Sequence, residues 1–428
     1  MQKMVLPGEW DTDFIPQGPK KKTRRMKRRK LIVIVSIALL LCLIVTAASA
    51  FALLKFKTTL VGNAVYHNNP SNMNYQSQSM HANGNNQPVT TINGLTRISV
   101  VGSTAFIVDG HGKTISVDPN PYGVAIAPTS MTASGSLKPG DILVTNFGAN
   151  STGTTLVRFP AGKGPGLLFN VINNPGNKGL AFEDFNTVTG SDWVANFSAN
   201  NVQVFKPDGT IKATITSPLF NKPWALASNH GMHNPMDGAT GSFFTTNTGD
   251  ATIDRIDVIP SNNGTTFRVF QIGQLTQING GTKINATWVP SLQIGGHQYS
   301  DVLLALDLAN NRVAAYPNST TLNTTAMRST SKGMTAFQGK PLNMPAGLTI
   351  NPLNGDLLVV NMNDNNLVEL NLSQGKPTGT HLLDNVPVDA QSGNGSALFG
   401  VAAAKDGMGN LEVFFTDDNL NTLNVLSM

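Results

Sequence analysis

PAGLTINPLNGDLLVVNMNDNNLVELN, which spans residues 345–371, is the most regular of several similar stretches in this 428-residue chain. It contains three short apolar segments separated by turns rich in Asn, Gly and Pro. The middle segment is a continuous apolar run, as in strands that are covered on both faces. The last segment alternates apolar and polar residues, as a strand nearer to solvent does. The stretch therefore predicts three consecutive β-strands joined by short turns.

Similar units recur from about residue 95, each with a second strand that ends in Asn or Asp. These strand-ending residues are Asn146, Asn196, Asn247, Asp307, Asn361 and Asp417, at spacings of 50, 51, 60, 54 and 56 residues. Four short strands with their turns fill about 40–50 residues, which is the size of one propeller blade. We therefore predict an all-β fold, a six-bladed β-propeller, over residues 95–428.

Closure of this propeller requires one more strand. The sixth unit stops at Met428, directly after its third strand, whereas residues 96–118 precede the first unit and contain strand-like runs. We expect this N-terminal segment to close the last blade, because pairing there joins the two ends of the propeller and removes an exposed strand edge.

Composition excludes several classes of protein. The 46 Asn, 41 Gly and 24 Pro disfavour coiled coils and helical bundles. The net charge of +5 divides into +9 for residues 1–57 (12 basic, 3 acidic) and −4 for the remainder (18 basic, 22 acidic). The propeller region has no basic stripe that would follow a phosphate backbone, so we expect no nucleic-acid partner.

The N-terminal region predicts a membrane anchor. Residues 20–30, KKKTRRMKRRK, carry nine positive charges, and residues 31–54 form an uncharged apolar run. Twenty-four helical residues span about 36 Å, enough for a hydrocarbon core of about 30 Å. The positive-inside rule predicts a cytoplasmic basic tail (1–30), a transmembrane signal-anchor helix (31–54), a polar flexible linker (55–94) and a propeller outside a single-pass cell membrane.

Cleavage of the signal is the alternative to an anchor. Ala48, Ser49 and Ala50 fit the small-x-small pattern of a cleavage site. The long basic region and an apolar run that continues past this site favour the anchor. Cleavage would give a secreted protein.

Two stretches resemble a known family. VLLALDLANNRVAAYP (302–317) and residues 345–371 resemble NHL repeats. The region 95–428 is similar to the wider superfamily of six-bladed propellers that includes gluconolactonase-like proteins, paraoxonases and streptogramin lyases. NPYGVAIAP followed by GDILVTNFG is similar to uncharacterised bacterial secreted propellers. The resemblance concerns the fold more than the activity, because propellers carry many functions.

The resemblance to lactonases implies a divalent metal in the central channel, held by Asn and Asp near strand ends and by an early Glu. Asn146, Asn196, Asn247 and Asp417 could match the Asn/Asp part, and Asp307 and Asn361 complete the ring. The metal would be Ca²⁺. No GEGP-like opening supplies the Glu, and Ca²⁺ usually takes several carboxylates, so a site of mostly neutral Asn would be weak. The alternative is that each Asn or Asp caps the turn after its strand.

The resemblance to streptogramin lyases instead implies a His general base. His230 and His233, in SNHGMHNP, are the candidate catalytic residues. No carboxylate within the motif orients them. The alternative is a pair of solvated loop histidines.

These observations leave two main functions open. The first is a membrane-anchored, extracytoplasmic and monomeric module that binds or scaffolds a protein, peptide or glycan at one mouth of the propeller. The segments 129–139, 229–242 and 276–298 are expected to cluster at that mouth. The second is a metal-dependent lactonase-like hydrolase or a lyase that works in the channel. A purely structural spacer is a third possibility.

Overall fold

The computed structural model describes residues 88–109, 111–131, 135–170, 176–229, 238–262, 264–279, 281–325, 327–389 and 393–428. The predicted tail (1–30), the predicted anchor (31–54) and the linker up to residue 87 lie outside these residues. Among the described residues, no helix has the length and apolar character needed to cross a membrane. All of them belong to one compact unit, residues 85–428.

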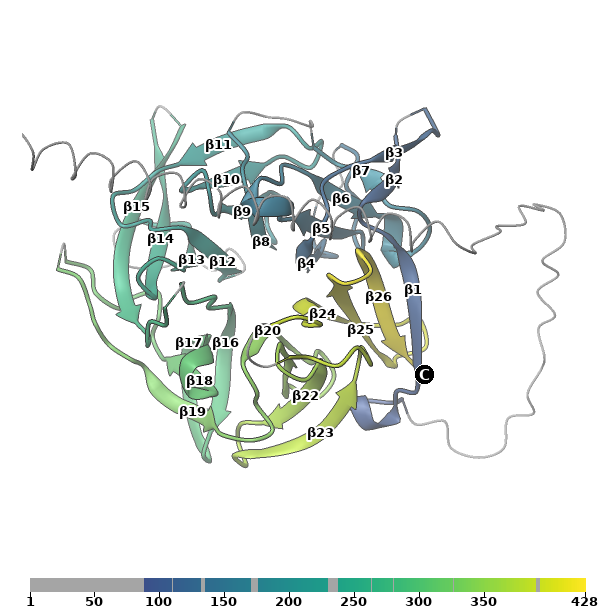
Figure 1. Ribbon diagram of the computed structural model, residues 1–428. Helices are drawn as coiled ribbons and strands as arrows, with labels where there is room; N and C mark the ends of the chain where they lie inside the picture. Colours follow the sequence, from purple (N-terminus) through teal and green to yellow (C-terminus); the bar gives the residue numbers. More distant parts are fainter. Residues whose placement is uncertain are drawn as a thin grey trace, which may run out of the picture. The chain divides into compact units, whose positions relative to one another are not determined.

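The described residues form six β-sheets that are arranged around a centre as the blades of a propeller (Figure 1). Five sheets have four strands, and the remaining one has six. The six-bladed β-propeller predicted from the repeat is therefore confirmed. We number the blades 1 to 6 by the chain order of their innermost strands.

The strands follow one another from the centre outward in each blade. The innermost strands are β4 (Pro121–Ile126), β8 (Leu180–Phe185), β12 (Pro223–Ser228), β16 (Ala286–Ile294), β20 (Pro345–Ile350) and β24 (Leu398–Lys405). The second strands are β5 (Ile142–Asn146), β9 (Asp192–Asn196), β13 (Gly241–Asn247), β17 (His297–Asp307), β21 (Leu357–Asn361) and β25 (Leu411–Asp417). The third strands are β6 (Leu156–Phe159), β10 (Asn201–Phe205), β14 (Thr252–Ser261), β18 (Arg312–Tyr316), β22 (Asn366–Asn371) and β26 (Thr422–Ser427).

The fourth strands of blades 1 to 5 are β7 (Leu167–Leu168), β11 (Ile211–Ile215), β15 (Gly264–Gln274), β19 (Met334–Gln338) and β23 (Lys376–Leu382). Short 3-10 helices within the described residues are η1 (Ile92–Gly94), η2 (Ala149–Ser151), η3 (Pro160–Gly162) and η4 (Leu308–Asn310).

Apolar side chains join each blade to its neighbours. The second strands β5, β9 and β21 are buried along their whole length, as their mostly apolar sequences predict. Leu304 and Val313 of blade 4 lie in one core cluster with Val359 and Leu370 of blade 5. Each blade therefore buries its faces against the next one, and no blade would be stable alone.

Closure of the ring uses the N-terminal segment. Strand β1 (Arg97–Ser103) pairs antiparallel with β26, which confirms that an N-terminal strand completes the last blade. Only this part of 96–118 does so. Strands β2 (Phe106–Val108) and β3 (Thr114–Ser116) form a hairpin at the outer side of blade 1, where β2 runs parallel to β7. The segment therefore connects two blades.

Residues 88–94, assigned to the linker by composition, belong to the propeller. Ile92 is fully buried, and its N–H donates a hydrogen bond of 3.0 Å to the carboxylate of Glu369 in blade 5. Asn351 donates to the same carboxylate and to the carbonyl oxygen of Thr90. The linker therefore ends earlier than predicted, because a buried carboxylate of blade 5 needs donors that this segment supplies.

Candidate functional site

The six strand-ending residues lie where the second strands end, which is the side on which the innermost strands begin. All six are buried. In blades 2, 3 and 5 the Asn Oδ1 accepts from a backbone N–H two residues before the innermost strand. These pairs are Asn196 with Lys178 (2.8 Å), Asn247 with Asn221 (3.0 Å) and Asn361 with Asn343 (3.1 Å). These hydrogen bonds therefore hold the chain segment that leads into the innermost strand of the same blade.

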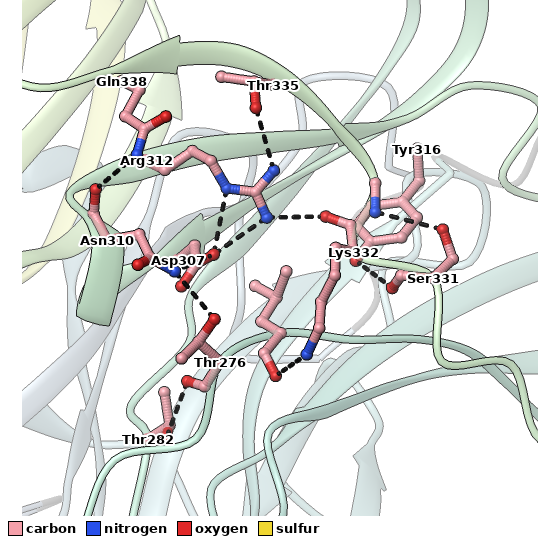
Figure 2. A network of polar contacts seen from close by, with 12 residues as sticks. Thr276, Thr282, Asp307, Asn310, Arg312, Tyr316, Ser331, Lys332, Thr335 and Gln338 are labelled. Atoms are coloured by element: carbon pink, nitrogen blue, oxygen red, sulfur yellow. Dashed lines mark hydrogen bonds and ion pairs between the residues drawn. The ribbon is translucent and has the colours of Figure 1, made fainter.

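The other members of the ring have different partners. Asn146 donates to the carbonyl oxygen of Thr104 (2.9 Å), and Asp417 accepts from the N–H of Leu420 (3.0 Å). Asp307 accepts two hydrogen bonds from the guanidinium of Arg312, at 3.1 and 3.0 Å (Figure 2). Asp417 thus bonds the backbone of the following turn, as the sequence suggested, and Asp307 also accepts from the Asn310 side chain in the turn after its strand, at 3.0 Å.

A metal at these six residues stays a prediction. Within the described ranges, no three His, Cys, Asp or Glu side chains are grouped so that they could hold a metal ion. His230 and His233 lie outside the described residues.

An aromatic cluster occupies the centre of the propeller where the innermost strands begin. Its members are Tyr122, Phe147, Phe182, Phe197, Trp224 and Phe399. The ring centroid of Tyr122 lies 4.1 Å from that of Phe399 and 4.5 Å from that of Phe147. Trp224 lies within 5.3–5.8 Å of four other rings. Aromatic pairs at these separations stabilise a core beyond the area that they bury.

Lys283 and Asp418 flank the aromatic cluster. The Lys283 Nζ lies 4.8 Å from the ring centroid of Phe399 and 5.5 Å from that of Trp224. Burial lowers the pKa of Lys283, and the charge of Asp418 opposes this shift. Burial raises the pKa of Asp418 to about 7, and Lys283 holds it lower than burial alone would. Each of the two charges therefore partly offsets the pKa shift that burial causes in the other group.

Threonine hydroxyls link neighbouring blades beside this cluster. Thr416 accepts from the N–H of Gly400 in its own blade (3.0 Å) and donates to the carbonyl oxygen of Tyr122 in blade 1 (3.3 Å). Thr145 and Thr246 make the equivalent bonds from blade 1 to blade 2 and from blade 3 toward blade 4. Each of these threonines directly precedes a strand-ending Asn or Asp. The hydroxyl satisfies two buried backbone groups at once.

A pocket of about 250 Å³ lies farther along the innermost strands. All six innermost strands contribute to its wall, which includes Val124, Leu226, Thr349 and Ala402. Phe182 belongs both to this wall and to the aromatic cluster, so the cluster closes one end of the pocket. We call this cavity the channel pocket. Its wall combines apolar residues with polar ones, among them Asp184, Asn285 and Thr287.

Glu183 is the most unusual group of the channel pocket. It is 5% exposed, and neither of its carboxylate oxygens has a hydrogen-bond partner among the described residues. The hydroxyl of Thr145 lies beside it but donates to the carbonyl oxygen of Ala181. Burial, and then the negative charge of Asp192, raise the pKa of Glu183 well above its ordinary value.

Close packing holds this carboxylate against the neighbouring blade. A β-carbon built on Gly123 would lie 2.0 Å from Glu183 Oε2 and 2.6 Å from Thr145 Oγ1. Gly123 is therefore required by the close approach of these side chains rather than by its own backbone conformation.

The clustering of segments 129–139, 229–242 and 276–298 at one mouth stays a prediction, because residues 132–134, 230–237 and 280 lie outside the described residues. Within the last segment, residues 286–294 are strand β16 and not part of an insertion. Sequence reasoning did not select Glu183, Lys283 or the aromatic cluster, whose members come from different repeats.

Comparisons with known proteins concern the fold. No protein-family model matches the chain, and no curated protein matches it. Among solved structures, virginiamycin B lyase from Staphylococcus aureus is 12% identical with a TM-score of 0.44, over 78% of this chain and 99% of that one. A protein of unknown function from Bacteroides thetaiotaomicron is 12% identical with a TM-score of 0.47, over 77% and 75%.

A chain in a nidogen/laminin complex is 13% identical with a TM-score of 0.43, over 71% of this chain and 96% of that one. Similarities at this level of identity do not transfer a ligand or an activity. The class of protein, a β-propeller, follows from the strand pairing of the chain itself.

Proposed function

We propose that the chain is a membrane-anchored, extracytoplasmic β-propeller that binds or scaffolds a protein, peptide or glycan, with part of that ligand inserted into the channel pocket. The observation that carries this proposal is the channel pocket itself, a cavity at the centre of the ring that is walled by all six innermost strands. Ligand sites of proteins lie preferentially in such central concave surfaces.

The membrane-anchored location rests on the sequence of residues 20–54. The charge asymmetry and the length of the apolar run support it. An impermeant protease added to intact cells should remove the propeller while residues 1–30 stay protected. Protection of the propeller, or its recovery in the medium without residues 31–54, would contradict the anchored topology.

Binding in the channel pocket is tested by filling it. Thr349 is half-buried in β20 and lines the channel pocket, whereas Thr380 is exposed in β23 of the same blade. The full chain in detergent micelles is screened against peptide and glycan arrays. Thr349→Phe should abolish binding of the ligands found, and the matched control Thr380→Phe should retain it. Equal binding by both variants would contradict the proposal.

The enzymatic alternative requires a metal or a general base in the channel. No observation on the described residues favours it over binding. The two candidate histidines are outside them. We therefore propose binding as the single function.

A further inference from the structure

A second cavity lies between the outer strands of blades 2 and 3. Its volume is about 410 Å³, and its lining is mainly apolar. Blade 2 contributes Trp193, Val204 and Ala213, and blade 3 contributes Val258 and Phe267. No described residue lines both this cavity and the channel pocket. We call this second cavity the interblade pocket. Its volume lies in the range of about 300–1,000 Å³ that is usual for small-ligand sites.

The interblade pocket opens onto the apolar core that joins the two blades. Trp193, Val204 and Phe243 belong to this core, and Val258 and Phe267 pack against it. The ring of Trp193 stacks on that of Phe243 with centroids 3.7 Å apart, and Phe267 meets Trp193 edge-on at 5.7 Å. Trp193 is 3% exposed, whereas Phe267 is only half-buried. An apolar group in the pocket would therefore extend this row of three rings and cover Phe267.

A β-bulge brings a charged residue to the pocket. Val204 pairs with Ala213 and Phe205 pairs with Ile211, so Lys212 is the extra residue of strand β11. Bulges change the direction of a side chain relative to the regular alternation of a strand. Lys212 and its neighbour Ala213 consequently both line the interblade pocket.

The charge that lines the interblade pocket is positive. Lys212 is exposed and is the one charged residue in the described lining. Thr189, Ser191 and Lys212 also line a neighbouring cavity of about 300 Å³, whose acidic residue, Asp208, lies beside Lys206. None of the ion pairs within the described residues includes Lys212. Its ammonium is therefore available to an anion from outside the chain.

These features together fit an anion with an apolar body. We propose that the interblade pocket binds an aromatic carboxylate, with the ring beside Trp193 and Phe267 and the carboxylate at Lys212. An apolar cavity of about 150 Å³ already holds a benzene ring, so 410 Å³ leaves room for a ring, a short stem and the carboxylate. A free aromatic acid and the C-terminal residue of a peptide share this chemistry.

Other classes of ligand fit the interblade pocket less well. A cationic ligand would meet Lys212 with no carboxylate in the described lining to offset the repulsion. A sugar would place many hydroxyl groups against a mainly apolar lining, where few of them would find hydrogen-bond partners. The combination of two aromatic residues with one lysine therefore selects an aromatic anion.

The test measures binding to the full chain in detergent micelles by isothermal titration calorimetry. The probes are 3-phenylpropionate, its neutral amide, phenethylamine, N-acetyl-Gly-Phe and the C-terminal amide of that peptide. Each carboxylate should bind about 2- to 5-fold more tightly than its amide, as expected for an ion pair at an exposed lysine. Added salt should reduce this difference, and phenethylamine should bind most weakly.

Two pairs of variants locate the site. Ala213 and Thr214 are neighbours on opposite faces of β11, and only Ala213 lines the interblade pocket. Ala213→Phe should abolish binding and Thr214→Phe should retain it, and partition of the probes into micelles is the same for both. Lys212→Met should remove the preference for carboxylates over amides. The control Lys376→Met, at an exposed lysine of β23, should keep it.

The outcomes distinguish the two sources of the ligand. Tighter binding of N-acetyl-Gly-Phe than of 3-phenylpropionate supports a peptide C-terminus, and the reverse supports a free acid. Equal binding of acid and amide by the unmodified chain, or an unchanged preference in Lys212→Met, would overturn the inference. Thr349→Phe fills the channel pocket and should not affect these probes, so the interblade pocket and the function proposed above can fail independently.

Discussion

The two ends of the central channel are built from the same six innermost strands but differ in how they are filled. At one end, six aromatic rings pack together, and Lys283 lies over three of them. At the other, the channel pocket keeps a space of about 250 Å³ and a buried carboxylate without a partner. The aromatic cluster therefore stabilises the ring of blades, whereas the end with the channel pocket is less completely packed.

The largest expected effect is at the aromatic cluster. Trp224→Ala should lower the free energy of unfolding by about 3–5 kcal/mol, because it removes a fully buried ring and leaves a cavity. Chemical denaturation of the full chain in micelles, followed by circular dichroism, measures it. Trp224→Phe is the control and should cost much less, since the indole N–H of Trp224 has no partner in the described residues. Equal losses would show that ring packing is not the main contribution.

The hydroxyl link between the last and the first blade should have the next largest effect. Thr416→Val leaves the N–H of Gly400 and the carbonyl of Tyr122 without this partner, which should cost about 1–3 kcal/mol. Thr416→Ser keeps the hydroxyl and should recover most of the loss. Thr287→Val, at the channel pocket, should cost less than Thr416→Val in the same denaturation experiment. A larger loss of unfolding free energy for Thr287→Val than for Thr416→Val would contradict the inference that the aromatic end contributes more stability than the pocket end.

Glu183→Gln should stabilise the propeller at high pH, in contrast to the changes at the aromatic cluster. Because the pKa of Glu183 is raised in the folded state, that state binds the proton more tightly than the unfolded chain does. Stability is therefore lost as pH rises above the ordinary value of 4.5 toward the raised pKa. The Gln variant avoids this loss, by about 1 kcal/mol at pH 8.5.

Denaturation of both proteins at several pH values measures this difference. The gain should disappear below pH 4.5, where the carboxyl is protonated in both states. A gain that is the same at pH 4 and pH 8.5 would show that packing, and not titration, is responsible.

The smallest effect concerns the charges beside the aromatic cluster. Lys283→Met keeps a long apolar side chain over the rings, so the free energy of unfolding should change by less than about 1 kcal/mol. Its effect should be on Asp418, whose pKa of about 7 should rise because the ammonium that lowers it is gone. Titration of the Asp418 carboxyl by NMR measures this change. An unchanged pKa would show that the two groups do not interact.

Much of the fold could be predicted from the repeat. Segments such as 355–361 and 365–371 match β21 and β22 closely, because burial and alternation are local patterns. The closing strand was also predictable, since the last repeat lacks its fourth strand. The boundary of the linker was not, because Ile92 and Thr90 look like linker residues until their contacts with blade 5 are known.

The site was less predictable. The strand-ending residues stand out in the sequence because they recur, and in blades 2, 3 and 5 they recur because each fastens the start of its blade. Glu183 occurs in one repeat only, so no pattern marks it. Lys283 lies in a connection between blades, where a charged residue is ordinarily solvated.

Six similar β-units, an N-terminal strand that completes the last of them and a net positive charge limited to residues 1–57 could all be recognised from the amino-acid sequence. These properties depend on local residue patterns and on residue counts. The set of side chains that meet in the channel depends instead on how the blades pack. Ring closure places Thr416 against Tyr122, 294 residues away along the chain, and Glu183 against Gly123 of the preceding blade. That packing buries the carboxylate of Glu183 without a hydrogen-bond partner among the described residues, and the burial raises its pKa.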